Sequence, residues 1–341
     1  MARSRSCSCG RRSYDAFSGC VLVKLYVAAL DCRKRVIDVT RRLAEYREFI
    51  SVNPVENLII SPLFMSKRLL KFYGDWRCGS VDLGVKLHSV MLDSGGFQVQ
   101  TGKISFSALC VRLMRIWQVV DWADYYVLPD HVPKSSDTDF EVESKIDDTL
   151  RAGERFLKLL PKGKQAIGVV HGRNLLQVLR CVQLWRSLGL SYVAFGSFGT
   201  SGPNGGINLV SKRSLSLLKA VSEEASSFGM RLHVFGISYP KVLRTLLDYG
   251  IKVSSLDSSG WWKAAAFNQV IFDETKPMRF VFNSTGRTKK YVLKVEDIEA
   301  EKLRTGHECP FCRDPMSLSD MVNRALHNLI VTLDFIGRNV L

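Results

Sequence analysis

The chain has 341 residues, of which 46% are apolar, so it can build a sizeable core and a wholly disordered protein is excluded. Lysine and arginine outnumber aspartate and glutamate by 48 to 33, which gives a net charge of +15. This excess favours a polyanionic partner such as nucleic acid, because each phosphate that a protein neutralises releases counterions. The alternative is a basic, solvated surface that binds nothing in particular.

The number of cysteines and the hydropathy of the chain indicate where in the cell the protein is expected. Nine cysteines are scattered along the chain, an odd number at irregular spacing that is not typical of a disulfide framework. We therefore expect a reducing, cytoplasmic location. No run of about 18 apolar residues occurs, so neither a transmembrane helix nor a membrane partner is expected.

The N-terminus is basic. Four arginines precede an apolar stretch from Gly19 to Leu30: Arg3, Arg5, Arg11 and Arg12. The order loosely resembles a signal peptide, but Lys24 interrupts the stretch and no small-residue cleavage site clearly follows. A flexible basic arm over residues 1–15, in contact with phosphates, is the favoured interpretation.

Short β-branched or apolar runs recur along the chain, with helical patterns between them. The predicted strands are Val21–Ala28, Asn57–Ile60, Ser89–Leu92, Tyr125–Leu128, Ala166–Val170, Tyr192–Phe195, Leu232–Phe235 and Val253–Leu256. Apolar residues three and four apart predict helices over Lys145–Leu160, Asn174–Leu188, Lys212–Phe228 and Lys241–Tyr249. Eight βα units predict an α/β protein with a (β/α)8 TIM barrel, for which about 250 residues is typical. A doubly wound open sheet is the alternative.

Unusual residues follow six of the predicted strands. These segments are Asp93-Ser94-Gly95-Gly96, Pro129-Asp130-His131, His171-Gly172, Gly196-Ser197-Phe198-Gly199, Gly236-Ile237-Ser238 and Asp257-Ser258-Ser259-Gly260. In a barrel they all lie on the rim at the carboxyl ends of the strands, where catalytic groups collect. Three carboxylates among glycines at one rim indicate an active site.

The segment that begins at Asp93 is the most informative of the six. Its two glycines allow the backbone to approach a ligand closely or to take a positive φ. The alternative is a tight turn in which Asp93 caps the next helix. The whole string from Asp93 to Val99, DSGGFQV, closely resembles the signature of the tRNA-guanine transglycosylase family.

The resemblance extends from about Ser89 to Asn328 and implies a barrel with two catalytic aspartates. By resemblance, Asp93 is the proton donor and acceptor, and Asp257, within Leu256-Asp257-Ser258, is the nucleophile. The residues that the resemblance assigns to base binding are Ser94, Asp130, His171, Gly196, Ser197 and Phe235. Of these, Asp130, in Leu128–Pro133, would read the guanine edge, and Gly196 and Ser197 would offer backbone groups.

These residue types suit base exchange. A carboxylate can attack the anomeric carbon and hold a covalent sugar intermediate. A second carboxyl group can protonate the departing purine and then deprotonate the incoming base. The logic is that of a retaining glycosidase in which a base, instead of water, completes the second step. The intermediate keeps the energy of the glycosidic bond, so no ATP is needed.

Four positions depart from the family pattern. His171 stands where the bacterial tRNA enzymes have Gln, Ser197 replaces the second glycine of a Gly-Gly pair, Val132 replaces Cys, and Phe235 replaces Met at the base-stacking position. Base exchange stays plausible with these changes. Which deazaguanine enters, and which polynucleotide is used, stay open.

A cysteine and histidine cluster near the C-terminus is the second strong signal. His307, Cys309 and Cys312 are followed by His327, and a Cys-Pro-x-Cys knuckle with a histidine on a following helix suits tetrahedral Zn²⁺. Four ligands with no vacancy indicate a structural site. His307 stands where the resembled family has a cysteine. The alternative is two buried free cysteines near unrelated histidines.

The chain also changes character from about Met278, and a final amphipathic helix is predicted over Ser319–Ile336. We expect the basic arm to be followed by a catalytic barrel over residues 16–285. A zinc-binding subdomain with a closing C-terminal helix would then occupy residues 286–341.

The favoured function is replacement of guanine in a polynucleotide by a free 7-deazaguanine base such as preQ1 or preQ0. By resemblance tRNA is the first choice, and DNA is the rival, because some relatives of the family modify DNA. Two other functions compete. A non-catalytic partner subunit would not need both Asp93 and Asp257, and an unrelated barrel enzyme such as an aldolase would place a lysine at a strand end. Members of the family often dimerise, so a homodimer is expected by resemblance.

Overall fold

The computed structural model describes residues 23–50, 53–134, 136–196, 211–237, 239–275, 277–281 and 292–339. Three predictions made from the sequence lie outside these residues. They are the basic arm over residues 1–15, the base-binding role of Ser197, and the domain boundary between residues 285 and 286.

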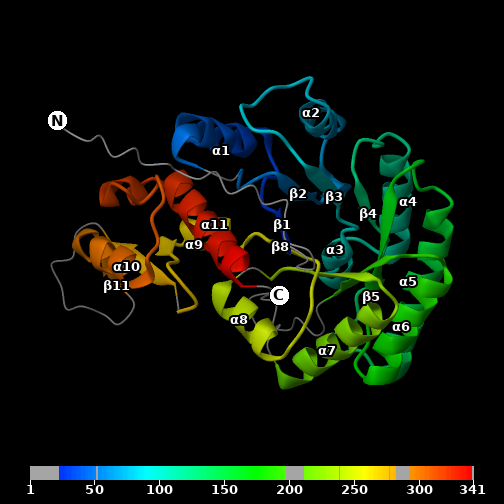
Figure 1. Ribbon diagram of the computed structural model, residues 1–341. Coiled ribbons are helices and arrows are strands. Elements are labelled where there is room, and N and C mark those ends of the chain that lie inside the picture. The colour runs from blue at the N-terminus through cyan, green and yellow to red at the C-terminus, as the bar shows by residue number, and fades with distance from the viewer. Residues whose placement is uncertain are drawn as a thin grey trace, which may run out of the picture.

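Eight parallel strands close into a barrel in chain order (Figure 1). They are β1 Lys24–Val27, β2 Asn57–Ile60, β3 Ser89–Leu92, β4 Tyr125–Val127, β5 Gln165–Val170, β6 Tyr192–Phe195, β7 Arg231–Val234 and β8 Ser255–Ser258. The first and last strands pair, with Leu25 opposite Leu256, and this pairing closes the barrel. The predicted (β/α)8 barrel is therefore confirmed, and the open doubly wound sheet is excluded.

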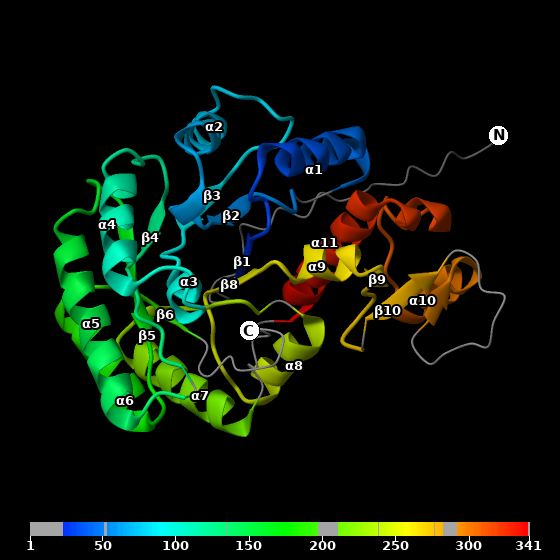
Figure 2. The ribbon, with the colours of Figure 1, turned by 180° about the vertical axis from the view of Figure 1, so that it is seen from behind.

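Most helices cover the outside of the barrel, as Figures 1 and 2 show from opposite sides, whereas α10 lies in the C-terminal part, away from the barrel strands. The helices of the described residues are α1 Arg33–Glu45, α2 Lys67–Arg77, α3 Gly96–Gln100, α4 Phe106–Trp117, α5 Asp139–Leu157, α6 Leu175–Ser187, α7 Lys212–Ser227, α8 Pro240–Asp248, α9 Gly260–Ala266, α10 Ile298–Thr305 and α11 Met321–Arg338. Short 3-10 turns occur at Arg47–Phe49, Pro62–Phe64, Val295–Asp297 and Pro315–Ser319. Local signals explain where helices begin: Thr138 accepts from the Glu141 backbone and forms a capping box at α5.

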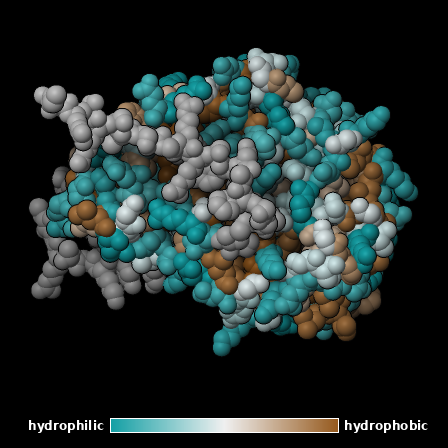
Figure 3. Space-filling model, in the orientation of Figure 1, coloured by the Kyte–Doolittle hydropathy of each residue, from teal (hydrophilic) through white to brown (hydrophobic). Residues whose placement is uncertain are grey.

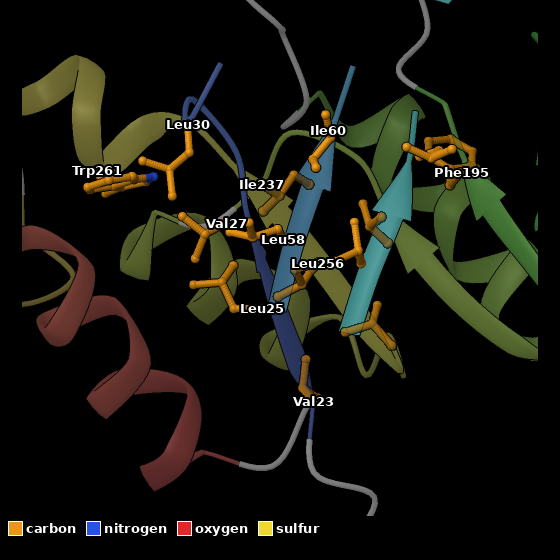
Figure 4. Packing of buried hydrophobic residues seen from close by; sticks show 14 of the residues in the cluster. Val23, Leu25, Val27, Leu30, Leu58, Ile60, Phe195, Ile237, Leu256 and Trp261 are labelled. Atoms are coloured by element: carbon orange, nitrogen blue, oxygen red, sulfur yellow. The ribbon is translucent and has the colours of Figure 1, made fainter. Parts of the chain in front are cut away.

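The strands separate two hydrophobic layers. Leu25 and Val27 of β1 belong to the larger layer between the strands and the helices, and Figure 4 shows them beside Leu58 of β2. Tyr26, between them in sequence, belongs to a smaller cluster inside the barrel. This alternation is the period of two expected of a strand. Fully burying a side chain such as Leu or Val contributes about 1.5–3 kcal/mol, so the many buried residues hold the strand ends firmly.

The eighth strand is displaced from its predicted position. It was expected at Val253–Leu256, but it runs over Ser255–Ser258, so Asp257 lies inside the strand and not after it. The prediction followed an apolar run, whereas Ser255 and Asp257 are polar and buried. Their burial is possible because both side chains hydrogen bond to His233.

A second, three-stranded sheet follows the barrel. It consists of β9 Gln269–Val270, β10 Met278–Val281 and β11 Val292–Lys294, with β10 in the middle. The helix α11 lies between this sheet and the barrel and packs on α9 (Figure 2). Arg324 of α11 fixes this contact, because its Nε and Nη2 donate to the Ala265 carbonyl at 3.0 and 2.9 Å.

The surface is mainly polar. Figure 3 shows hydrophilic side chains over most of the described part of one face, with apolar side chains gathered toward the lower right of the view. In the part of the chain that the structure describes, no helix has both the length and the apolar character that crossing a membrane requires.

Candidate active site and metal cluster

A cavity of about 1010 Å³ opens at the carboxyl ends of the barrel strands. Every residue predicted to be catalytic or base-binding lines it, apart from Ser197, which lies outside the described residues. These lining residues are Asp93, Ser94, Asp130, His171, Gly196, Phe235 and Asp257. They come from the ends of six different strands, and the closed barrel brings them to one place.

The two glycines after Asp93 have different structural roles. Gly95 takes a φ of +86° and precedes the first residue of α3, so it makes the turn. A β-carbon built on Gly96 would lie 2.3 Å from Oδ1 of Asp130, so this position allows a close approach. Asp93 is not the cap of α3, because Gly95 occupies that position. Its backbone instead continues the sheet, with Asp93 N donating to the Ile60 carbonyl at 2.8 Å.

Asp130 is a buried carboxylate that neighbouring groups hold in place. Ser94 Oγ donates to its Oδ1, and His171 Nε2 lies 3.0 Å from its Oδ2. His171 in turn packs on Gly196, where a β-carbon would lie 2.4 Å from Cε1 of the ring. Four of the predicted base-binding residues therefore form one packed unit on one wall of the cavity.

Asp93 lies in an environment that favours its neutral form. The side chain is only partly exposed, and desolvation raises the pKa of its carboxyl group to about 6. The negative charges of Asp130 and Asp257 add to this effect, while a hydrogen bond from the Gly95 backbone opposes it. A carboxyl group with a pKa near neutrality can both give and take a proton, as general acid and base catalysis requires.

Asp257 lies on the strand that closes the barrel. Its Oδ1 accepts from the backbone N–H of Gly236 at 2.9 Å and lies 3.2 Å from Nε2 of His233. Asp257 does not cap the following helix, because α9 begins after Ser259. The carboxylate is thus fixed by the neighbouring strand and loop, at the edge of the cavity.

Aromatic and basic side chains complete the lining. Phe235 lines the cavity and packs edge-on against His233, with ring centroids 4.7 Å apart. Trp262 also lines it, and the Arg35 guanidinium lies 4.5 Å from the Trp262 ring centroid. Trp261 belongs to the core instead, where its Nε1 donates to a backbone carbonyl; Figure 4 shows its place there.

Several polar contributors were not predicted from the sequence, and His233 and Arg35 are two of them. His233 contacts Asp257, and Arg35 stacks at the cavity. His233 lies on β7, two positions before Phe235, which directly follows the strand, so the period of two is the signal that marks His233 as facing inward like Phe235. Arg35 lies on a helix after the first strand, and no motif marks it.

The second cluster lies in the C-terminal part of the chain. His307, Cys309, Cys312 and His327 are all buried, and their potential ligand atoms lie within 4.8 Å of one another. Cys309 Sγ is 3.5 Å from Cys312 Sγ and 3.4 Å from Nδ1 of His327. All four predicted ligands therefore meet, and the cluster could hold a metal ion.

The orientation of both imidazoles fits a metal. His327 Nε2 donates to the Ile271 carbonyl at 2.9 Å, which leaves Nδ1 facing the cysteines. His307 Nδ1 lies 3.2 Å from Oδ2 of Asp334, and its buried Nε2 has no hydrogen-bond partner among the described residues. Metal-binding histidines usually donate their second N–H to a carboxylate or carbonyl in this way. The geometry thus supports His307 as a ligand.

The two thiols of the cluster have pKa values shifted in opposite directions. A hydrogen bond from Cys309, and the nearby imidazoles, lower the pKa of Cys312, whereas burial and then the Cys312 thiolate raise the pKa of Cys309. A bound cation would relieve this conflict, because a coordinating thiol is deprotonated outright.

A search against models of known protein families gave no match for this chain, and no curated protein matched it either. The fold and the cavity define a (β/α)8 barrel with three carboxylates at the carboxyl ends of its strands and a separate, buried His/Cys cluster. The function is therefore inferred from the groups that these sites contain.

Proposed function

We propose that this protein is a glycosyltransferase that exchanges guanine in a polynucleotide for a 7-deazaguanine base such as preQ1 or preQ0. The first-choice polynucleotide is tRNA. One observation carries the proposal: Asp93, Asp130 and Asp257 come from strands far apart in sequence and line a single cavity. Their environments differ, which is how a site assigns separate roles to similar groups.

The reaction would proceed in two displacements. Asp257 attacks C1′ of the target nucleotide, the bond from C1′ to N9 of guanine breaks, and the carboxyl group of Asp93 gives its proton to the departing base. The deazaguanine then enters, returns a proton to Asp93 and forms a bond to C1′ as the bond to Asp257 breaks. Two displacements at one carbon retain its configuration.

Base recognition is proposed for the wall that contains Asp130. Guanine presents two adjacent donors, N1–H and the 2-amino group, that match a carboxylate; adenine has an acceptor at N1. Each oxygen of Asp130 accepts one hydrogen bond from the protein and keeps a further acceptor position for the base. Phe235 would stack on the base, which suits its position in the cavity.

The nucleic-acid partner is supported by charge. The chain carries a net +15, and Arg35 and Lys263 both line the cavity beside the carboxylates. Such groups can neutralise the phosphates that flank a nucleotide drawn out of its stack. The same chemistry on DNA is the competing proposal, since duplex DNA offers the same phosphates and the same guanine edge.

We propose Zn²⁺ as the metal of the His/Cys cluster. Two thiolates and two imidazoles in tetrahedral arrangement suit zinc and leave no open position for a substrate. None of the four residues is among those that line the described cavity, so the ion would have a structural role. It would join the loop after α10 to α11.

Labelled guanine tests the proposal. The wild-type protein and Asp257→Asn would each be incubated with labelled guanine and, in separate reactions, with bulk tRNA and duplex DNA of equal guanine content. We expect label in tRNA with the wild type and none with the variant. Label in DNA alone would move the proposal to the DNA substrate. Label in neither pool, or equal label with the variant, would overturn the enzymatic assignment.

A further inference from the structure

His233 is a fully buried histidine directly beside the proposed nucleophile. It lies on β7, one strand away from Asp257 on β8, and its Nε2 is 3.2 Å from Oδ1 of Asp257. Rings enclose it, with Tyr26 and Phe235 in edge-on contact. A buried imidazole needs partners for both nitrogens, because an unpaired buried polar group is costly.

The other ring nitrogen is fixed by a chain of hydroxyl groups. His233 Nδ1 lies 2.6 Å from Ser255 Oγ, which also hydrogen bonds to Tyr192 OH. Burial raises the pKa of Tyr192 to about 12, so this hydroxyl keeps its proton. A carboxylate oxygen only accepts, so the contact between Nε2 and Oδ1 of Asp257 requires a proton on Nε2, while Nδ1 is held by Ser255 Oγ.

The two oxygens of Asp257 are therefore not equivalent. Oδ1 accepts from the Gly236 backbone at 2.9 Å and from His233, whereas Oδ2 has no hydrogen-bond partner among the described residues. An oxygen that two donors hold is a weaker nucleophile than one without donors, because its lone pairs are engaged and its charge is stabilised.

We propose that His233 is a positioning residue that holds Oδ1 of Asp257 and leaves Oδ2 as the attacking atom. The inference rests on the proposed base exchange. In the first displacement the new bond joins Oδ2 to C1′, the bond from C1′ to the purine nitrogen breaks, and the proton on the departing base comes from Asp93. His233 neither gains nor loses a proton in this step. It fixes the rotation of the carboxylate toward the sugar.

Three variants of one position test this role. Glutamine places its amide nitrogen near the site of Nε2 and keeps a donor for Asp257, asparagine reaches only the site of Nδ1, and alanine reaches neither. We expect His233→Ala and His233→Asn to lower kcat for guanine incorporation roughly ten- to hundredfold, the range for losing one hydrogen bond to a charged group. KM for guanine should not change, and His233→Gln should restore most of kcat.

The controls separate this inference from the proposed function. Circular dichroism melting would show whether each variant is folded at the assay temperature, and the wild type must incorporate label for the comparison to be made. If the wild type is inactive, the proposed function itself fails. If the wild type is active and all three variants match it, or if glutamine loses as much kcat as alanine, the positioning role is overturned.

Discussion

Gly96 faces Asp130 so closely that a β-carbon on Gly96 would lie 2.3 Å from Oδ1 of the carboxylate. Gly96→Ala must therefore displace Asp130 and break its hydrogen bonds to Ser94 and His171. We expect a loss of about 1–3 kcal/mol in the free energy of unfolding, as for other overpacked sites. Guanine affinity, measured by calorimetry, should fall at least about tenfold, since one hydrogen bond to a charged group contributes this much.

Gly337→Ala is the matched control for this substitution. Gly337 lies near the end of α11, and a β-carbon there would meet nothing within 4 Å. Because alanine favours a helix by up to about 1 kcal/mol over glycine, this variant should be neutral or more stable. Equal guanine affinity in the two variants would contradict the role of Gly96.

The raised pKa of Asp93 predicts a cost to stability. Because folding raises this pKa from 3.8 to about 6, the folded state favours the protonated group. Protonated Asp93 therefore contributes to the free energy of unfolding. This contribution is fully present below pH 3.8, declines as pH rises and is lost above pH about 6, where the buried group is ionised. Asp93→Asn should therefore raise the stability at pH 7.5, by on the order of 2 kcal/mol, and the difference should vanish near pH 4. Melting curves at both pH values measure it; a constant difference would contradict the assignment.

The same group predicts the pH dependence of the first displacement. In the proposed reaction Asp93 must be protonated to donate to the departing guanine, so the rate of covalent-adduct formation should fall as pH rises through about 6. Single-turnover trapping of the adduct on a denaturing gel would follow this rate. A rate that does not change between pH 5 and 8 would contradict the assignment of Asp93 as the general acid.

The proposed zinc site predicts one zinc ion per chain, bound by the His/Cys cluster. Cys309→Ser should lose the metal, whereas Cys78→Ser, at an exposed cysteine, should retain it. Asp334→Ala should weaken binding about 10–100-fold through His307, since outer partners of metal-binding histidines contribute this much. Elemental analysis and competition with a coloured chelator measure both effects. Equal zinc in the two cysteine variants would rule out this site.

The barrel and most of its rim could be predicted from the sequence because its strands are short apolar runs followed by glycines and carboxylates. The bounds of the eighth strand did not follow this pattern. Ser255 and Asp257 are polar residues inside that strand, and they can be buried because they hydrogen bond to His233. His233 itself is neither apolar nor part of a motif. Its role depends on a neighbour from the next strand, and pairing between strands cannot be read from local composition.

The packing of α11 on α9 connects the two sites. His327 and Arg324 lie on α11, and Arg324 holds the backbone of α9, whose first residues line the cavity beside Asp257. The proposed metal site on one side of α11 and the proposed active site beyond α9 are therefore connected through these two helices. If both proposals hold, a chelator should inhibit the exchange reaction from a distance, and this inhibition should be non-competitive with guanine.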